Sequence, residues 1–302
     1  MPHFQHLAGV YAAALTPLHA DFSPNLEAIP RLLDFLARRG CHGALLLGTT
    51  GEGPSFSPAE RENILRAALA VRQVHPEFRL LAGTGTPSLQ ETIDITRSAF
   101  DLGIDGVVVL PPYYYRKASE EGLFAWFSQV IEKAVPAGGA LLGYHIPSVS
   151  GVPLSLDLLA RLRASHPDRF AGIKDSSADP DHARALGERF GDELFVLTGN
   201  DPLFSLALEN HASGCITALA NLYSPELRRV WEARCQDETD SIAQARLQAA
   251  RSVLDRHPPA PPLLKAELAR SYDFPLWTVR PPLLPLTPEQ QQTILVEFDS
   301  VR

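Results

Sequence analysis

The sequence predicts an α/β fold, a (β/α)8 TIM barrel with a C-terminal helical extension. Short apolar runs alternate along the chain with longer amphipathic ones, which is the pattern of βα units around a parallel sheet. Eight such pairs fit within about the first 220 of the 302 residues. This length accommodates one large barrel or two ordinary domains, and the repeated pattern favours the single barrel.

The eight predicted strands have the length and apolar content of buried parallel strands. They cover residues 10–15, 43–47, 79–82, 106–110, 140–145, 170–174, 194–197 and 214–217. The predicted helices that follow the first seven of them cover residues 25–39, 57–74, 88–102, 120–134, 155–164, 179–190 and 202–210. Ser57, Pro58 and Glu60 supply an N-cap, a proline at the first helical position and a capping-box glutamate. We therefore assign residues 1–220 to the barrel.

Residues 221–302 exceed what the barrel needs, and we predict that they form a helical extension packed on its flank. Helical patterns cover residues 225–254, as one or two helices, and then residues 263–271 and 288–298. A proline-rich break at residues 258–262 separates the first of these patterns from the second. The many prolines in this part of the chain favour a fixed path.

Composition is typical of a soluble globular protein, with 45% hydrophobic and 21% charged residues. No apolar run reaches the roughly 20 residues that span a bilayer, and the N-terminus does not resemble a secretory signal. We therefore expect a cytoplasmic protein with no membrane partner. A net charge of −8 disfavours nucleic acid as a partner, although a small anionic substrate stays possible.

The sequence indicates neither a metal site nor a cofactor. Cys41, Cys215 and Cys235 are widely spaced and odd in number, which argues against a disulfide framework and a CxxC metal site. No GxGxxG or Walker-type loop is present. His145 stands alone, with no second histidine or carboxylate pattern around it, and we interpret it as a structural residue or as one that supports the site residues without touching the substrate.

Lys174 is the candidate nucleophile. In a barrel of this kind the active site lies at the C-terminal ends of the strands, and Lys174 is the only one of the four lysines that ends a strand. Desolvation at such a position disfavours the charged ammonium, and a neutral amine can attack a carbonyl to form a Schiff base. The alternative is a lysine whose ammonium group simply reaches out of the strand end into water.

Hydroxyl groups at neighbouring strand ends are the candidate proton donors and acceptors. A Schiff base needs protons moved at each step, and the phenol of Tyr144 can both donate and accept one. Hydroxyls of Thr49 and Tyr114 are placed to pass that proton onward. Thr50, in a glycine-flanked turn, offers a seat for a carboxylate. The alternative for the tyrosines is that their rings are simply packed, with their hydroxyls satisfied. The alternative for Thr50 is that it lies in an ordinary tight turn.

Three carboxylates also follow strands. Glu52, Asp175 and Asp201 are candidates for general acid or base catalysis. For the two aspartates, we expect that capping of the helices that follow is their main task.

The motifs of the chain resemble those of the dihydrodipicolinate synthase / N-acetylneuraminate lyase family of class I, Schiff-base aldolases. The resemblance covers residues 10–286. Its motifs, in family order, are Gly48-Thr49-Thr50-Gly51-Glu52, Pro112-Tyr113-Tyr114, Tyr144-x-x-Pro147 and Gly172-Ile173-Lys174-Asp175.

This resemblance implies a Schiff base between Lys174 and pyruvate, or the pyruvyl end of a 2-oxo acid. Tyr144 would be the general acid and base, with Thr49 and Tyr114 completing a proton relay. Thr50 would hold the pyruvyl carboxylate.

The resemblance also implies further binding residues and an assembly. Gly199 and Ile216 would line the pocket through backbone groups. Tyr113 matches the tyrosine that reaches into a neighbouring subunit's relay, which implies a homotetramer that is a dimer of dimers. Residues 115–121 are one residue longer than is common in the family, so the assignment among Tyr113, Tyr114 and Tyr115 stays open.

Departures from the family pattern narrow the substrate. Dihydrodipicolinate synthases carry a carboxylate-binding arginine where this chain has Val149, and a valine cannot hold a carboxylate. The usual asparagine is replaced by His145. We expect an aldolase that reversibly cleaves a 2-keto-3-deoxy sugar acid, or a related 4-hydroxy-2-oxo acid, to pyruvate and an aldehyde. The alternatives are a dihydrodipicolinate synthase, a keto-deoxy sugar acid dehydratase and a non-catalytic ligand-binding barrel.

Overall fold

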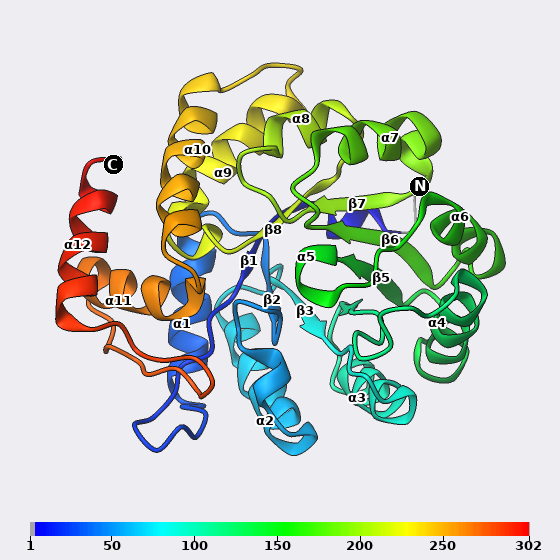
Figure 1. Cartoon of the computed structure of the whole chain (residues 1–302), viewed down its shortest axis with the longest axis horizontal. Coiled ribbons are helices and arrows are strands. Elements are labelled where there is room, and N and C mark those ends of the chain that lie inside the picture. The colour runs from blue at the N-terminus through cyan, green and yellow to red at the C-terminus, as the bar shows by residue number, and fades with distance from the viewer. Residues whose placement is uncertain (1–3, 302) are drawn as a thin grey trace.

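A closed barrel of eight parallel strands forms the centre of the protein, as the computed structural model shows for residues 4–301 (Figure 1). Neighbours in the chain are neighbours in the sheet, and β8 pairs with β1 to close it. The strands are β1 (Gly9–Ala13), β2 (Gly43–Leu46), β3 (Arg79–Gly83), β4 (Gly106–Val109), β5 (Ala140–His145), β6 (Phe170–Asp175), β7 (Phe195–Thr198) and β8 (Gly214–Thr217). The predicted (β/α)8 fold is therefore confirmed. Residues 1–3 of the predicted barrel, and residue 302 of the predicted extension, lie outside the described part.

Helices surround the barrel on its outer face (Figure 1). They are α1 (Ala28–Arg38), α2 (Pro58–Ala68), α3 (Leu89–Asp101), α4 (Glu120–Ala134), α5 (Pro147–Ser150), α6 (Leu156–Ser165), α7 (Pro180–Phe190), α8 (Phe204–Glu209), α9 (Ala220–Cys235), α10 (Ser241–Arg256), α11 (Ala260–Tyr272) and α12 (Pro288–Asp299). Short 3₁₀ turns occur at Gln5–Leu7, Gly53–Ser55, Leu69–Gln73 and Gly191–Glu193. None of the helices in residues 4–301 has the length and apolar content to cross a membrane.

The helices differ from the predicted ones in three places. The predicted helix 57–74 ends as an α-helix at Ala68 and continues as a 3₁₀ turn, and Ser57 caps it through the predicted capping box. The predicted break at 258–262 contains the start of α11, because prolines are tolerated in a first helical turn. The one-turn helix α5 was not predicted, since four residues carry no helical period.

Each strand separates two apolar layers, because alternate side chains point to opposite faces of a sheet. One layer fills the barrel and contains Tyr11, Leu45, Leu81, Val108, Leu142, Tyr144, Phe195, Leu197 and Ile216. The other layer lies between the strands and the helices. Tyr144 therefore points into the barrel, whereas its neighbour His145 points toward the helices.

Helices α9 to α12 follow the last strand, and α9 begins at residue 220, the predicted end of the barrel. Helix α9 packs against β1 and β8, and α10, α11 and α12 lie together on the side of the barrel next to α1 (Figure 1). Aromatic contacts join α1 to this part of the chain. The ring of Phe35 lies 4.9 Å from that of Tyr272 and 5.2 Å from that of Phe274, measured between centroids.

A buried ion pair ties the extension to the loop after β2. Lys265 of α11 donates to the carboxylate of Glu52 at 2.6 Å and to the carbonyl of Thr278 at 2.7 Å. Both charged side chains are fully buried. The second carboxylate oxygen of Glu52 accepts the backbone N–H of Arg280 at 2.8 Å. Glu52 is thereby satisfied on both oxygens by the extension.

Replacing Lys265 by methionine is expected to lower the free energy of unfolding by about 3–5 kcal/mol, because it leaves a buried carboxylate without its cation. Urea unfolding measures this change. The matched control is Arg66→Met, which removes the exposed cation of the Arg66–Glu62 pair and is expected to cost less than about 1 kcal/mol. A loss at Lys265 no larger than the loss at Arg66 would contradict the role of this pair.

Candidate active site

Lys174 and Tyr144 lie opposite each other on adjacent strands. The β5–β6 register pairs Tyr144 with Lys174 and places both side chains inside the barrel near the C-terminal strand ends. Lys174 is only 3% exposed and Tyr144 only 5%. The Nζ atom of Lys174 lies 4.1 Å from the centroid of the Tyr144 ring. The amine is thus held inside the barrel mouth and does not extend into water.

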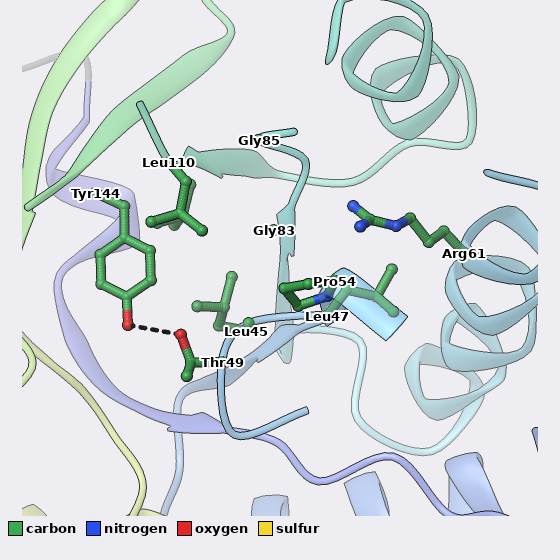
Figure 2. A pocket seen from close by; sticks show the side chains of 11 residues that line it. Leu45, Leu47, Thr49, Pro54, Arg61, Gly83, Gly85, Leu110 and Tyr144 are labelled. Carbon is green, nitrogen blue, oxygen red and sulfur yellow. Dashed lines mark hydrogen bonds between the residues drawn. The ribbon is translucent and has the colours of Figure 1, made fainter. Parts of the chain in front are cut away.

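Thr49 completes a contact with the tyrosine hydroxyl. Its Oγ1 lies 3.4 Å from the hydroxyl oxygen of Tyr144, and either atom can be the donor (Figure 2). Thr49 lies in the loop after β2, beyond the strand end at Leu46. The structure therefore brings together three of the predicted residues, Lys174, Tyr144 and Thr49.

The electrostatic surroundings of Tyr144 favour its phenolate. Burial by itself raises the pKa of Tyr144, but the nearby ammonium of Lys174 and hydrogen bonds from Thr49, Lys174 and Ser176 outweigh it, so the pKa lies below its usual value. A phenol so placed exchanges a proton more readily than an ordinary tyrosine.

Ser176 was missed by the sequence-based reasoning, although a signal for it exists. It lies two residues after Lys174 and therefore on the same face of the extended chain. Gly199 provides the room for it, because a Cβ atom on Gly199 would lie 1.9 Å from the Ser176 hydroxyl oxygen. The N–H of Gly199 donates to the carbonyl of Asp175 at 2.6 Å.

Several further predicted residues have positions that fit their expected roles without testing them. Ile216 of β8 is fully buried in the layer that fills the barrel. Thr50 is 9% exposed, in the same loop as Thr49. Val149 lies on α5 and is 57% exposed. The roles of Gly199, Ile216, Thr50 and Val149 remain predictions.

The tyrosines after β4 are not brought to Thr49 within one chain. Tyr114 and Tyr115 are 77% and 65% exposed, with their rings edge to face at 5.4 Å. Tyr113 is half-buried, and burial raises its pKa. None of the three lines the cavity beside Tyr144. The relay role of Tyr114 and the assignment among the three tyrosines therefore stay predictions.

A cavity opens beside Tyr144 and Thr49. Figure 2 shows its lining, which consists of Leu45, Leu47, Gly48, Thr49, Pro54, Arg61, Gly83, Gly85, Val108, Leu110 and Tyr144. Most of these residues are apolar or glycine, so the few polar groups act in surroundings of low polarity.

Arg61 is a second cation in this cavity that the sequence reasoning missed. Its side chain is buried, and its Nε–H donates to the carbonyl of Phe56 at 3.1 Å. Figure 2 shows Arg61 on the opposite side of the lining residues from Tyr144. Burial lowers the pKa of Arg61, and the charges of Glu91 and Tyr113 oppose that effect. Its position on α2, away from any strand end, explains why a search of strand ends did not find it.

The carboxylates at the strand ends are occupied by structural contacts. Glu52 is paired with Lys265, and Asp201 is fully buried against Arg251 at 3.2 Å. The prediction that the two aspartates cap helices was wrong, because α7 is capped by Asp179 and α8, which begins at Phe204, has no side-chain cap. Asp175 instead accepts the N–H of Ser177 at 3.0 Å.

His145 has the neighbours that the sequence reasoning failed to identify. His182 of α7 stacks on its ring with centroids 4.6 Å apart and planes inclined by 17°. One ligand atom from each of His145, Asp175 and His182 lies within 4.8 Å of the others. The view that no histidine or carboxylate surrounds His145 was therefore wrong. Nitrogen lone pairs lie in the ring plane, so two nearly parallel stacked rings do not aim at one ion.

Lys174→Met is expected to raise the pKa of Tyr144 above its usual value of about 10, because the cation that opposes the effect of burial is gone. Phenolate absorbance measures this in difference titrations, in which each protein is compared with its own Tyr144→Phe partner to cancel the other tyrosines. Lys133→Met, on the surface of α4, is the control and leaves the titration unchanged. A Tyr144 pKa that stays low without Lys174 would contradict the electrostatic account.

Comparisons with known proteins agree with this geometry. The profile of the Dihydrodipicolinate synthetase family matches residues 6–299. An uncharacterized DapA-like lyase of Chloroflexus aurantiacus is 40% identical over 294 residues, which are 97% of this chain and 96% of that protein. A 4-hydroxy-tetrahydrodipicolinate synthase of Corynebacterium urealyticum is 33% identical over 253 residues, which are 83% and 80% of the two chains.

A solved structure has the same architecture. The crystal structure of dihydrodipicolinate synthase from Agrobacterium tumefaciens superposes with a TM-score of 0.87 at 29% identity, covering 97% of this chain and 99% of that one. The profile match and the relatives span nearly the whole chain and name lyases and synthases of one kind. The chain therefore belongs to the dihydrodipicolinate synthetase family and is a class I lyase built on a (β/α)8 barrel.

Proposed function

We propose that this lyase works through a Schiff base between Lys174 and pyruvate, or the pyruvyl end of a 2-oxo acid. The observation that supports the proposal is the buried pairing of an amine with a tyrosine whose hydroxyl contacts Thr49. An amine with an adjacent proton donor and acceptor is what carbinolamine formation and dehydration require.

The chemistry balances with these residues alone. The Nζ atom of Lys174 attacks the C2 carbonyl of the substrate, and loss of water leaves an iminium. In the cleavage direction the C4 hydroxyl gives up its proton, the C3–C4 bond breaks, and the aldehyde leaves behind an enamine. Protonation of the enamine at C3 and hydrolysis release pyruvate and free Lys174. Tyr144, with its pKa lowered, is the group placed to take and return these protons.

The proposed substrate is a 2-keto-3-deoxy sugar acid or a related 4-hydroxy-2-oxo acid. Val149 supports this choice, because it is the position at which a synthase of this family would present a carboxylate-binding arginine. The competing hypothesis is that the protein is a dihydrodipicolinate synthase. The relatives from Corynebacterium urealyticum and Agrobacterium tumefaciens carry such names and favour that reading.

We also propose that the protein is a cytoplasmic homotetramer. The exposure of Tyr114 and Tyr115 supports an assembly, because large aromatic rings at a loop tip are typical of protein contacts. A second copy would also supply Tyr113, the tyrosine that the resemblance places in a neighbouring subunit's relay. The cytoplasmic location rests on the sequence alone.

The test is turnover of a panel in both directions. We expect retro-aldol release of pyruvate from at least one of 2-keto-3-deoxygluconate, 2-keto-3-deoxygalactonate, N-acetylneuraminate and 4-hydroxy-2-oxoglutarate. Lys174→Met is expected to lose at least about 1,000-fold in kcat, because no other amine of residues 4–301 lies in the site. Lys133→Met is the control and retains activity.

Two outcomes would contradict the proposal. Condensation of pyruvate with aspartate semialdehyde at a rate near that of the best panel substrate would overturn the reading of Val149. Absence of turnover on every substrate, by folded protein, would favour a ligand-binding barrel over an enzyme of this substrate class.

A further inference from the structure

His145 joins three parts of the barrel behind the reacting residues. It follows Tyr144 on β5, and the register pairs it with Asp175, the residue after Lys174. Its side chain points outward, away from the substrate cavity, and is 5% exposed. A residue placed there touches no substrate, so any effect on the reaction passes through the elements that it contacts.

One of those elements is the loop between β5 and α6, residues 146–154. The Nδ1 atom of His145 accepts the backbone N–H of Leu154 at 3.0 Å, which fastens the returning end of the loop to the strand where it began. Leu154 is 1% exposed, so water does not replace this acceptor. Its side chain lies over Gly143, where an added Cβ atom would come within 2.8 Å of the Leu154 Cδ1 atom.

The rest of the loop is organised from within. The hydroxyl of Ser150 donates to the carbonyl of Val152 at 3.1 Å and accepts the N–H of Val152 at the same distance. The short helix α5, which carries Val149, is closed by bonds from Ser150 and Gly151 back to Ile146 and Pro147. These bonds shape the loop tip but do not attach it to the barrel. Among the hydrogen bonds of the described residues, the one between His145 and Leu154 attaches this loop to the barrel, beside the packing of Val152 and Leu154 in the core.

The opposite side of the imidazole packs on α7. His182 stacks on it, and the Nε2 atom of His182 lies 4.0 Å from a carboxylate oxygen of Asp175. Burial lowers the pKa of His145 to about 4, and the charge of Asp175 only partly opposes this. His145 is therefore neutral at physiological pH, the state in which Nδ1 can accept a hydrogen bond.

We propose that His145 is a positioning residue that holds the loop of residues 146–154 in place over the barrel mouth and thereby sets the affinity for the aldehyde half of the substrate. The pyruvate half is bound by groups inside the barrel, so its affinity does not depend on His145. The claim about affinity for the aldehyde rests on the proposed function. The hydrogen bond between His145 and the Leu154 N–H does not depend on that function.

The test compares two variants of nearly the same shape, His145→Asn and His145→Leu. The Oδ1 atom of asparagine is separated from Cα by the same number of bonds as Nδ1 of histidine and can accept the Leu154 N–H. Leucine fills the same space and cannot. Both variants lose the ring that stacks on His182, so their difference isolates the hydrogen bond.

The first readout is hydrogen exchange of the Leu154 amide, which needs no substrate. In His145→Leu the amide is expected to exchange about tenfold faster than in the wild type, because its buried N–H is left without an acceptor. In His145→Asn it is expected to stay within about twofold of the wild type. Equal exchange in the two variants would overturn the proposal.

The second readout is the condensation of pyruvate with glyceraldehyde as a probe aldehyde. His145→Leu is expected to raise the KM for glyceraldehyde about tenfold and to leave the KM for pyruvate within about twofold, while in His145→Asn both KM values are expected to stay within about twofold of the wild type. A loss shared equally by both substrates, or by kcat alone, would show a general structural role and overturn the proposal.

Failure of the proposed function is distinguishable from failure of this inference. Wild-type protein that neither condenses nor cleaves any tested substrate would count against the proposed function, and the claim about aldehyde affinity would fall with it. The exchange measurement would still decide whether His145 holds the loop.

Discussion

The register between β5 and β6 is the constraint on which the site depends. It sets Tyr144 against Lys174 on the inside of the barrel and, one residue further, His145 against Asp175 on the outside. A slip of one residue would exchange the two faces and carry the amine out of the barrel. Because a closed barrel leaves no free edge, neighbouring strands on both sides hold this register in place.

The loops above this pair are held from outside the barrel. Glu52, which follows Thr49 and Thr50, is fixed by Lys265 and by the backbone of Arg280. On the other side of the barrel mouth, His145 holds the end of the loop that carries Val149. The extension and the outer layer therefore support the loops that carry Thr49 and Val149.

Much of this was predictable from the sequence, and the exceptions share one cause. The period of apolar residues predicted all eight strands, and the strand-end rule singled out Lys174, Tyr144 and Thr49. Contacts between residues distant in the chain were not predictable, because no local pattern reports them. Arg61 on α2 reaches the cavity, and the His182 ring on α7 reaches His145, only through packing. The predicted role of Tyr113 is a related case, since it depends on a neighbouring subunit.

The central claim is that the amine of Lys174 becomes covalently bonded to pyruvate. The most direct measurement is to incubate the protein with pyruvate, reduce it with borohydride, digest it and locate the adduct by mass spectrometry. The account predicts one adduct, on the peptide that contains Lys174, which disappears in Lys174→Ala. A folded protein that carries no adduct, or an adduct on another lysine, would contradict it.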